Sequence, residues 1–288
     1  MPWYQITDPQ DPKLDELAAQ YQLHPLHIED CRHRRQRAKV EERPDYFFVV
    51  LKPVETMPDS ELNFPDFDIF VGRDFCITVT EGSSGVIHDA LARCERLAAP
   101  DRPDEIFYRL FDSIVDSYLP ATDHINDRLD DLEDRVLDQP TPAAMQEILH
   151  LKRALIELRR VLVNTRDVGL HVQREPGSLI SADLFPFFRD IYDHIARNID
   201  LVETARDILN GSLDVYLSSV ANRTNQVMKV LTLLSTVALP AIVITGVYGM
   251  NIKGIPFIDS PYGAQVVVGI MIATTALLLW GLKRMGWF

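Results

Sequence analysis

The pattern of apolar positions sets the end of the chain apart from the rest. Residues 230–252 and residues 260–282 each form a run of 23 residues without a charge. A helix needs roughly 20 apolar residues to cross a hydrocarbon core of ~30 Å, and core helices of soluble proteins rarely run this long without a charge. We therefore expect two membrane-spanning helices, joined by residues 253–259 into a hairpin.

Amphipathic helical patterns precede the two spans. Apolar residues recur at steps of three and four from 107 to 136, from 148 to 162 and from 188 to 220. The polar side of the first pattern is acidic and that of the second is basic, so we expect these two helices to pair antiparallel. We also expect a bend in the first helix at Pro120. The third pattern has no proline between Pro186 and Pro240, which predicts one helix from about 187 to 248, on the order of 90 Å long.

The first hundred residues follow another pattern. Short runs rich in β-branched and aromatic residues, at 45–51, 67–71 and 75–80, are separated by turn signals and helical stretches. This predicts a small α/β domain with a largely buried sheet. The expected organisation is an α/β domain at 1–103, a helical stalk region at 104–222, a first transmembrane helix at 223–251, a loop at 252–261, and a second transmembrane helix with a basic C-terminus at 262–288.

Charge divides the chain at the same place. The chain has 29 Lys and Arg against 42 Asp and Glu, and only five of these bases and one of these acids lie in residues 223–288. Residues 1–222 therefore have a net charge of −17 and the remainder +4, which opposes binding to nucleic acid. Basic residues flank both spans, whereas the connecting loop has one Lys and one Asp. This bias predicts that both termini are cytoplasmic, in an inner or plasma membrane.

The sequence gives little support for catalysis. His24, His27, Glu29, Asp30 and His33 are possible metal ligands, but their spacing matches no zinc hydrolase signature. Neither a nucleophile elbow nor a phosphate-binding glycine loop is present, and the three cysteines have no CxxC spacing. We expect no enzyme and no organic cofactor. A membrane-anchored scaffold without transport is a further alternative.

The first span carries small and weakly polar residues on or near one helical stripe. These are Asn225, Met228, Thr232, Ser235, Leu239, Ile242 and Gly246. Such a stripe can line a pore, and it can equally be a close-packing face between membrane helices. Two helices cannot enclose an aqueous path, so transport would require several copies of the chain.

At the outer end of this span stands Tyr248-Gly249-Met250-Asn251. Here the sequence resembles the CorA family of magnesium channels, whose hallmark is a Gly-Met-Asn tripeptide that closes the first of two C-terminal transmembrane helices. The resemblance extends to NQVMKVLTLL at 225–234, LKRALIELRR in the second helical pattern and FRDIYDHI before the membrane. It covers nearly the whole chain.

The resemblance implies a funnel-shaped homopentamer in a lipid bilayer, with the first span of each subunit lining the pore. Gly249, Met250 and Asn251 would form the selectivity filter, and five Asn251 amides could hold the hydration water of Mg²⁺ without removing it. Asn225 would form a polar ring at the inner entrance. Met228, Leu231, Ser235 and Leu239 would be successive constrictions, and apolar rings can gate by dewetting.

The resemblance also implies closure by cytosolic Mg²⁺ bound between subunits. Asp190 occupies the sensor position, with Asp66 or Asp68 of the adjacent subunit as its expected partner, and Lys283 and Arg284 are a sparse form of the family's basic collar. The outer loop GIPFIDSPYG lacks the acidic stretch of many CorA proteins and is reminiscent of the zinc transporter ZntB. The resemblance therefore implies transport of Mg²⁺, and also of Co²⁺ and Ni²⁺, with a proton-coupled, ZntB-like transporter of Zn²⁺ as the alternative.

Overall fold

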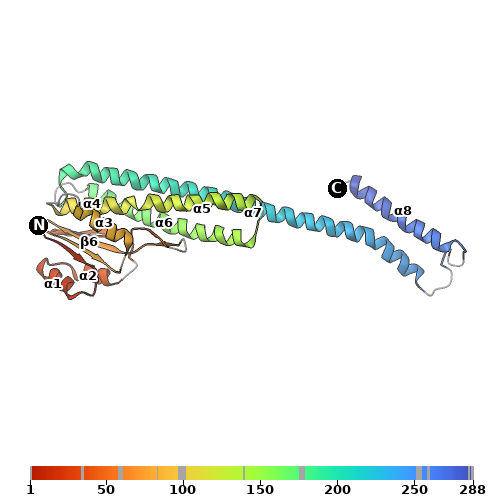
Figure 1. Cartoon of the computed structure of the whole chain (residues 1–288), viewed down its shortest axis with the longest axis horizontal. Helices are drawn as coiled ribbons and strands as arrows, with labels where there is room; N and C mark the ends of the chain where they lie inside the picture. The colour runs from red at the N-terminus through yellow and green to blue at the C-terminus, as the bar shows by residue number, and fades with distance from the viewer. Residues whose placement is uncertain are drawn as a thin grey trace. The chain divides into compact units, whose positions relative to one another are not determined.

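The structure is a computed structural model, shown in Figure 1, and describes residues 2–33, 36–57, 61–82, 84–96, 102–138, 140–174, 179–250, 255–257, 260–284 and 286. The chain forms two compact units, Met1–Asp214 and Val215–Phe288. The first unit holds a sheet and most of the helices. The second holds the end of one long helix and one further helix.

A five-stranded mixed sheet organises the N-terminal part of the first unit. Its order is β1 (Trp3–Ile6), β7 (Cys76–Thr80), β6 (Phe67–Gly72), β3 (Tyr46–Leu51) and β2 (Lys39–Glu42), with β1 parallel to β7 and the other neighbours antiparallel. A separate short hairpin pairs β4 (Glu55–Thr56) with β5 (Leu62–Asn63). The predicted α/β domain is thereby confirmed.

Both faces of the sheet are covered. Every residue of β3 and β6 is buried, which is why β3 is continuously apolar and β6 is largely so, with Asp68 as its buried acid, instead of alternating. Figure 1 shows α1 (Pro12–Gln20) and α2 (Pro25–Arg32) on one side of the sheet, and α3 (Gly85–Arg96) and α4 (Pro103–Asp116) on the other. On the first side, Leu14 and Ile28 pack with Phe48 and Phe70, which lie opposite each other in the β3–β6 register.

The helical break in the first amphipathic pattern precedes Pro120. α4 ends at Asp116 and α5 (Tyr118–Asp138) begins two residues later. Ser117 ends α4, because its amide and its hydroxyl both donate to the carbonyl of Ile114, at 3.1 and 2.6 Å. Pro120 then lies in the first turn of α5, where a missing amide hydrogen leaves no bond unmade. The predicted bend is therefore a break at Ser117.

The acidic and basic helices lie side by side, as predicted, but apolar residues hold them together. α5 packs on α6 (Pro142–Arg174) through buried Leu129, Leu132 and Leu151. Arg128 and Glu147 form the ion pair that joins the two helices among the described residues. Asp127, Asp130 and Asp131 of α5 face solvent instead.

After a short 3-10 turn, η1 (Ala182–Leu184), α7 runs without interruption from Phe185 to Tyr248, and α8 spans Gly263–Arg284. Both helices are long and apolar enough to cross a membrane, and their most apolar windows are 6% and 0% buried. The hydroxyls of Thr232, Thr236 and Thr245 donate to carbonyls one turn earlier in α7, at 2.8, 2.8 and 2.7 Å. The long helix and the two apolar C-terminal helices are thus confirmed.

Candidate functional site

The residues expected to line an ion path lie on one side of α7. At about 100° per residue, the stripe residues fall within about 120° of the helix circumference. Met228, Leu231, Leu239 and Ile242 are 55 to 66% exposed, Asn225, Ser235 and Gly246 are also exposed, and Thr232 is half-buried. The protomer leaves this stripe uncovered, so it is available to water, lipid or another copy of the chain.

The C-terminal end of α7 requires a glycine. The amide of Gly249 donates to the carbonyl oxygen of Thr245 at 2.8 Å. A Cβ added at Gly249 would lie 2.9 Å from that same oxygen, which is closer than real Cβ atoms approach. Met250, whose amide donates to Val247 at 3.2 Å, is 50% exposed. Asn251 lies outside the described residues, so its expected place at the pore mouth stays a prediction.

Asp190 lies on α7 in the first unit, and its side chain is 66% exposed. His194, one turn later, has its Nε2 atom 3.8 Å from Asp190 Oδ2. Two acids of α4 belong to the same neighbourhood, because Asp116 and Asp190 both raise the pKa of Asp112. The largest cause of that raised pKa is burial of the Asp112 carboxyl, which disfavours its charged form.

Sequence reasoning missed Asp112. Its position four residues before Asp116 on the polar side of α4 is a pattern that surface acids share. Only the packing of α4 beside α7 brings it near Asp190. The result is a group of three acids of which Asp112 is half-buried, and their negative charge is partly offset by Arg93, which pairs with Asp116 at 3.0 Å, and by His194. A bound cation would relieve the repulsion that remains around Asp112.

Asp66 and Asp68 do not fit the role of partner acid. Asp66 is 6% exposed and forms an ion pair with Lys52. Asp68 is 1% exposed, in the middle of β6 between Val50 of β3 and Val79 of β7. Both carboxylates lie inside the protomer, where an adjacent subunit could not reach them. Within the described residues, no three His, Cys, Asp or Glu side chains are arranged to hold a metal ion.

The histidine cluster near the N-terminus is also not a metal centre. His27 is fully buried and stacks on Phe48. Its Nδ1 lies 2.9 Å from the Tyr46 hydroxyl and its Nε2 lies 3.1 Å from Glu41 Oε2. Burial, the largest cause, lowers the pKa of His27. Asp30 accepts a hydrogen bond from Lys39 at 2.7 Å, so each of these potential ligands is engaged in a structural contact.

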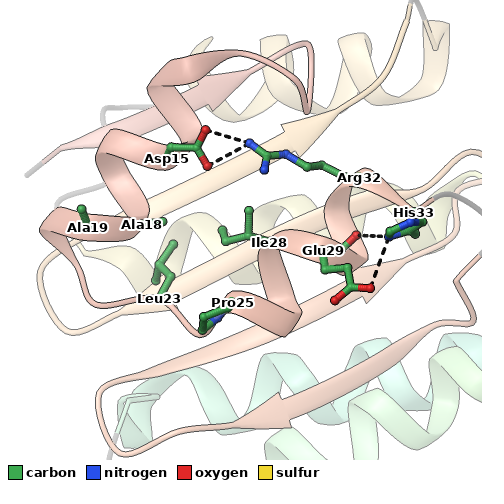
Figure 2. A pocket seen from close by; sticks show the side chains of 9 residues that line it. All are labelled: Asp15, Ala18, Ala19, Leu23, Pro25, Ile28, Glu29, Arg32 and His33. Atoms are coloured by element: carbon green, nitrogen blue, oxygen red, sulfur yellow. Dashed lines mark hydrogen bonds and ion pairs between the residues drawn. The ribbon is translucent and has the colours of Figure 1, made fainter.

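Glu29 and His33 border a hollow of about 570 Å³ between α1 and α2, and His24 caps α2, because its Nδ1 accepts a hydrogen bond from the Leu26 amide at 3.3 Å. Figure 2 shows its two charged edges. Asp15 receives two hydrogen bonds of 2.9 Å from Arg32, and His33 lies 3.7 Å from Glu29. The Asp15–Arg32 pair joins α1 to α2, whereas the Glu29–His33 pair links one turn of α2 to its C-terminal cap.

The basic residues at the end of α8 follow a tryptophan. Arg284 places its guanidinium 5.4 Å from the ring centroid of Trp280, one turn earlier. Lys283 is exposed beside it. Aromatic and basic residues together at the end of an apolar helix are typical of a membrane interface. Their expected role as a basic collar stays a prediction.

Comparison with known proteins covers the whole chain. The family described as CorA-like Mg2+ transporter protein matches residues 1–284. The cobalt/magnesium transport protein CorA of Thermotoga maritima is 36% identical over 270 residues, which are 92% of this chain and 77% of that protein. The complete structure of the CorA magnesium transporter from Methanocaldococcus jannaschii has a TM-score of 0.83 and 25% identity, covering 99% of this chain and 91% of that one. The zinc transport protein ZntB of Pectobacterium carotovorum is 27% identical over 179 residues, 61% of this chain and 54% of that protein.

These likenesses agree with the architecture described above, from the N-terminal sheet to the two apolar helices at the C-terminus. The sequence stretches on which the resemblance to the CorA family was based all lie within the residues that the family matches. This chain therefore belongs to the CorA-like Mg2+ transporter family and is a membrane-embedded transporter of divalent metal cations.

Proposed function

We propose that the protein is a homopentameric channel that conducts Mg²⁺, and also Co²⁺ and Ni²⁺, across the inner or plasma membrane with both termini in the cytoplasm. The observation that carries this proposal is the uncovered stripe of α7, which leads to the Gly249-Met250-Asn251 end of that helix. Only 6% of the most apolar window of α7 is buried in the protomer, so this part of the helix needs lipid on some sides and other subunits on the rest.

Around a common axis, each stripe residue becomes a ring of identical side chains. Asn225 would supply amides at the inner entrance, and the hydroxyl oxygens of Thr232 and Ser235 would face a hydrated ion farther along. Met228 and Leu239 would form apolar rings, which exclude water when the pore is narrow. Thr232 already donates its hydrogen to the Met228 carbonyl, so its oxygen remains an acceptor for hydration water of the cation.

Regulation would use the acids beside Asp190. One protomer supplies Asp190 and Asp112 without a complete set of metal ligands in its described part, so we infer that an adjacent subunit completes the site. When the site is empty, the carboxylates repel one another, and when a cation occupies it, the cation bridges them. Asp190 and the stripe belong to the same 64-residue helix, which offers a direct route from cation binding to the pore.

A second candidate is a ZntB-like, proton-coupled transporter of Zn²⁺. Two observations favour it: the outer loop 252–261 lacks an acidic stretch, with Lys253 two residues after Asn251, and a zinc transport protein is among the relatives of this chain. A positive charge beside the filter would disfavour accumulation of a divalent cation there.

Flux into liposomes tests both candidates. Purified protein is reconstituted, and entry of Mg²⁺, Co²⁺, Ni²⁺ and Zn²⁺ is compared with and without a proton gradient. The channel predicts Mg²⁺ entry that is independent of the gradient, and it predicts that Asn251→Ala abolishes this entry while the oligomer persists. Tyr262→Phe, at the start of α8, serves as the control that retains flux. Entry restricted to Zn²⁺ and dependent on the gradient would replace the first candidate by the second.

A further inference from the structure

A second hollow in the first unit, of about 600 Å³, has the chemistry of an anion site. One wall is α6, which contributes Glu157, Arg160 and Asn164. The other wall comes from Arg37, just before β2, and from Asn63 and Phe64 at the end of β5. This size lies within the range of roughly 300 to 1,000 Å³ that small-molecule sites occupy.

Two arginines in this hollow have no ion-pair partner among the described residues, although the carboxylate of Glu157 lines the same hollow. They are Arg37 and Arg160, and both are exposed. Lys52 also lines the hollow, but Asp66 neutralises it. Positive charge that faces an open hollow is unexpected in a region whose net charge is −17.

Arg160 is accessible from two sides. It and Asn164 also line a neighbouring hollow of about 390 Å³ between α6 and α7. The other two arginines there, Arg159 and Arg206, are both held by Glu203. Among the described residues, the arginine of this part of α6 without an ion-pair partner is therefore Arg160, whose planar guanidinium suits two-pronged contacts with phosphate oxygens.

We propose that this hollow binds a nucleoside polyphosphate, with Arg37 and Arg160 on its phosphates and its base against Phe64. Phe64 is half-buried, so one part of its ring is available for stacking. Asn63 and Asn164 offer amides to the edge of the base, and Glu157 accepts hydrogen bonds from ribose hydroxyls. This site goes beyond the proposed function, since it adds an organic regulator on the side of the membrane where the acidic unit lies.

Isothermal titration calorimetry of the full-length protein in lipid nanodiscs tests the proposal. The probes are ATP, inorganic triphosphate and adenosine, with Mg²⁺ removed by chelation so that the nucleotide cannot act by withdrawing the ion from the acids around Asp190. We expect ATP to bind with a Kd below about 1 mM, triphosphate to bind more weakly, and adenosine not to bind. Because the assay involves no transport, its outcome is independent of the proposed channel activity.

Substitutions of the residues that line the hollow test whether ATP binds there. Arg160→Gln and Arg37→Gln should each weaken ATP binding about tenfold, the value of one charged hydrogen-bonded contact. Phe64→Leu should weaken ATP binding and leave triphosphate binding unchanged. The matched control is Arg153→Gln, an exposed arginine two turns earlier on the same face of α6 that lines neither hollow.

Three results would overturn the proposal. The first is equal binding of ATP and adenosine, or no binding of ATP, because then no phosphate is recognised. The second is an equal loss in Arg153→Gln, which would show diffuse attraction to a basic helix. The third is unchanged ATP binding in Arg160→Gln together with a smaller oligomer, which would mean that another subunit fills the hollow.

Discussion

Replacing Gly249 by alanine should separate transport from assembly. The new Cβ would lie 2.9 Å from the carbonyl oxygen of Thr245, a backbone atom that cannot swing away as a side chain could. The same oxygen accepts the Gly249 amide at 2.8 Å, so relieving the contact lengthens that hydrogen bond or displaces the helix end by a few tenths of an ångström. We assign a local cost of about 1–2 kcal/mol to this adjustment.

The displacement would act on Asn251, two residues later. If the whole cost falls on the placement of the filter, the barrier to ion passage rises by the same amount, and flux falls roughly 5- to 30-fold. Flux of Mg²⁺ into liposomes measures this effect, with size-exclusion chromatography to verify the oligomer. Gly269→Ala on α8 is the control, because a Cβ there meets nothing within 4 Å. Wild-type flux in Gly249→Ala would show that the close contact at the helix end has no bearing on conduction.

The remaining predictions concern the first unit. Asp190→Ala should raise the internal Mg²⁺ concentration needed for closure about tenfold. The control is Asp200→Ala, which removes an exposed acid of the same helix and should leave that concentration unchanged. Identical inhibition curves for the two variants would contradict the sensor role. Lys52→Met should lower the free energy of unfolding by about 3–5 kcal/mol, because it leaves the buried carboxylate of Asp66 without its ion-pair partner Lys52. The control is Lys152→Met at an exposed position, which should leave thermal unfolding unchanged. Asp112→Asn should stabilise the metal-free protein at neutral pH. Folding raises the pKa of Asp112 above its ordinary 3.8. The wild-type protein therefore loses stability as the pH rises through the folded pKa, because the carboxyl ionises less readily in the folded state, and the asparagine variant avoids this loss. The gain over wild type should shrink as pH falls toward 3.8, and a gain that persists there would argue against the electrostatic cause.

Local patterns were sufficient to predict the main elements. The two uncharged runs correspond to the end of α7 and to α8, and the absence of proline before Pro240 agrees with the continuity of α7. β3 and β6 are recognisable as short apolar runs between turn signals, because both faces of each strand are covered. These features depend on neighbours in sequence, which is why sequence reasoning could find them.

Features that depend on distant residues were predicted less well. Asp66 and Asp68 resemble surface acids in the sequence, and their burial follows from the pairing of β6 with β3 and from the ion pair with Lys52. The position of the break near Pro120 depends on the hydrogen bonds of Ser117. The neighbourhood of Asp112 and Asp190 depends on how α4 packs beside α7, a relation that neither helix reveals alone.

The hydrogen bonds of the threonine hydroxyls in α7 have a consequence for the insertion of a single subunit into the membrane. Since Thr232, Thr236 and Thr245 satisfy their donors within their own helix, a freshly inserted single subunit presents no unmet hydroxyl donor at these positions to the lipid tails. Such a subunit can diffuse laterally in the bilayer with the hydroxyl donors of all three threonines satisfied. If several copies assemble as proposed, the oxygen of Thr232, which lies on the stripe, would exchange hydrocarbon for water while its hydrogen bond to the Met228 carbonyl stays unchanged.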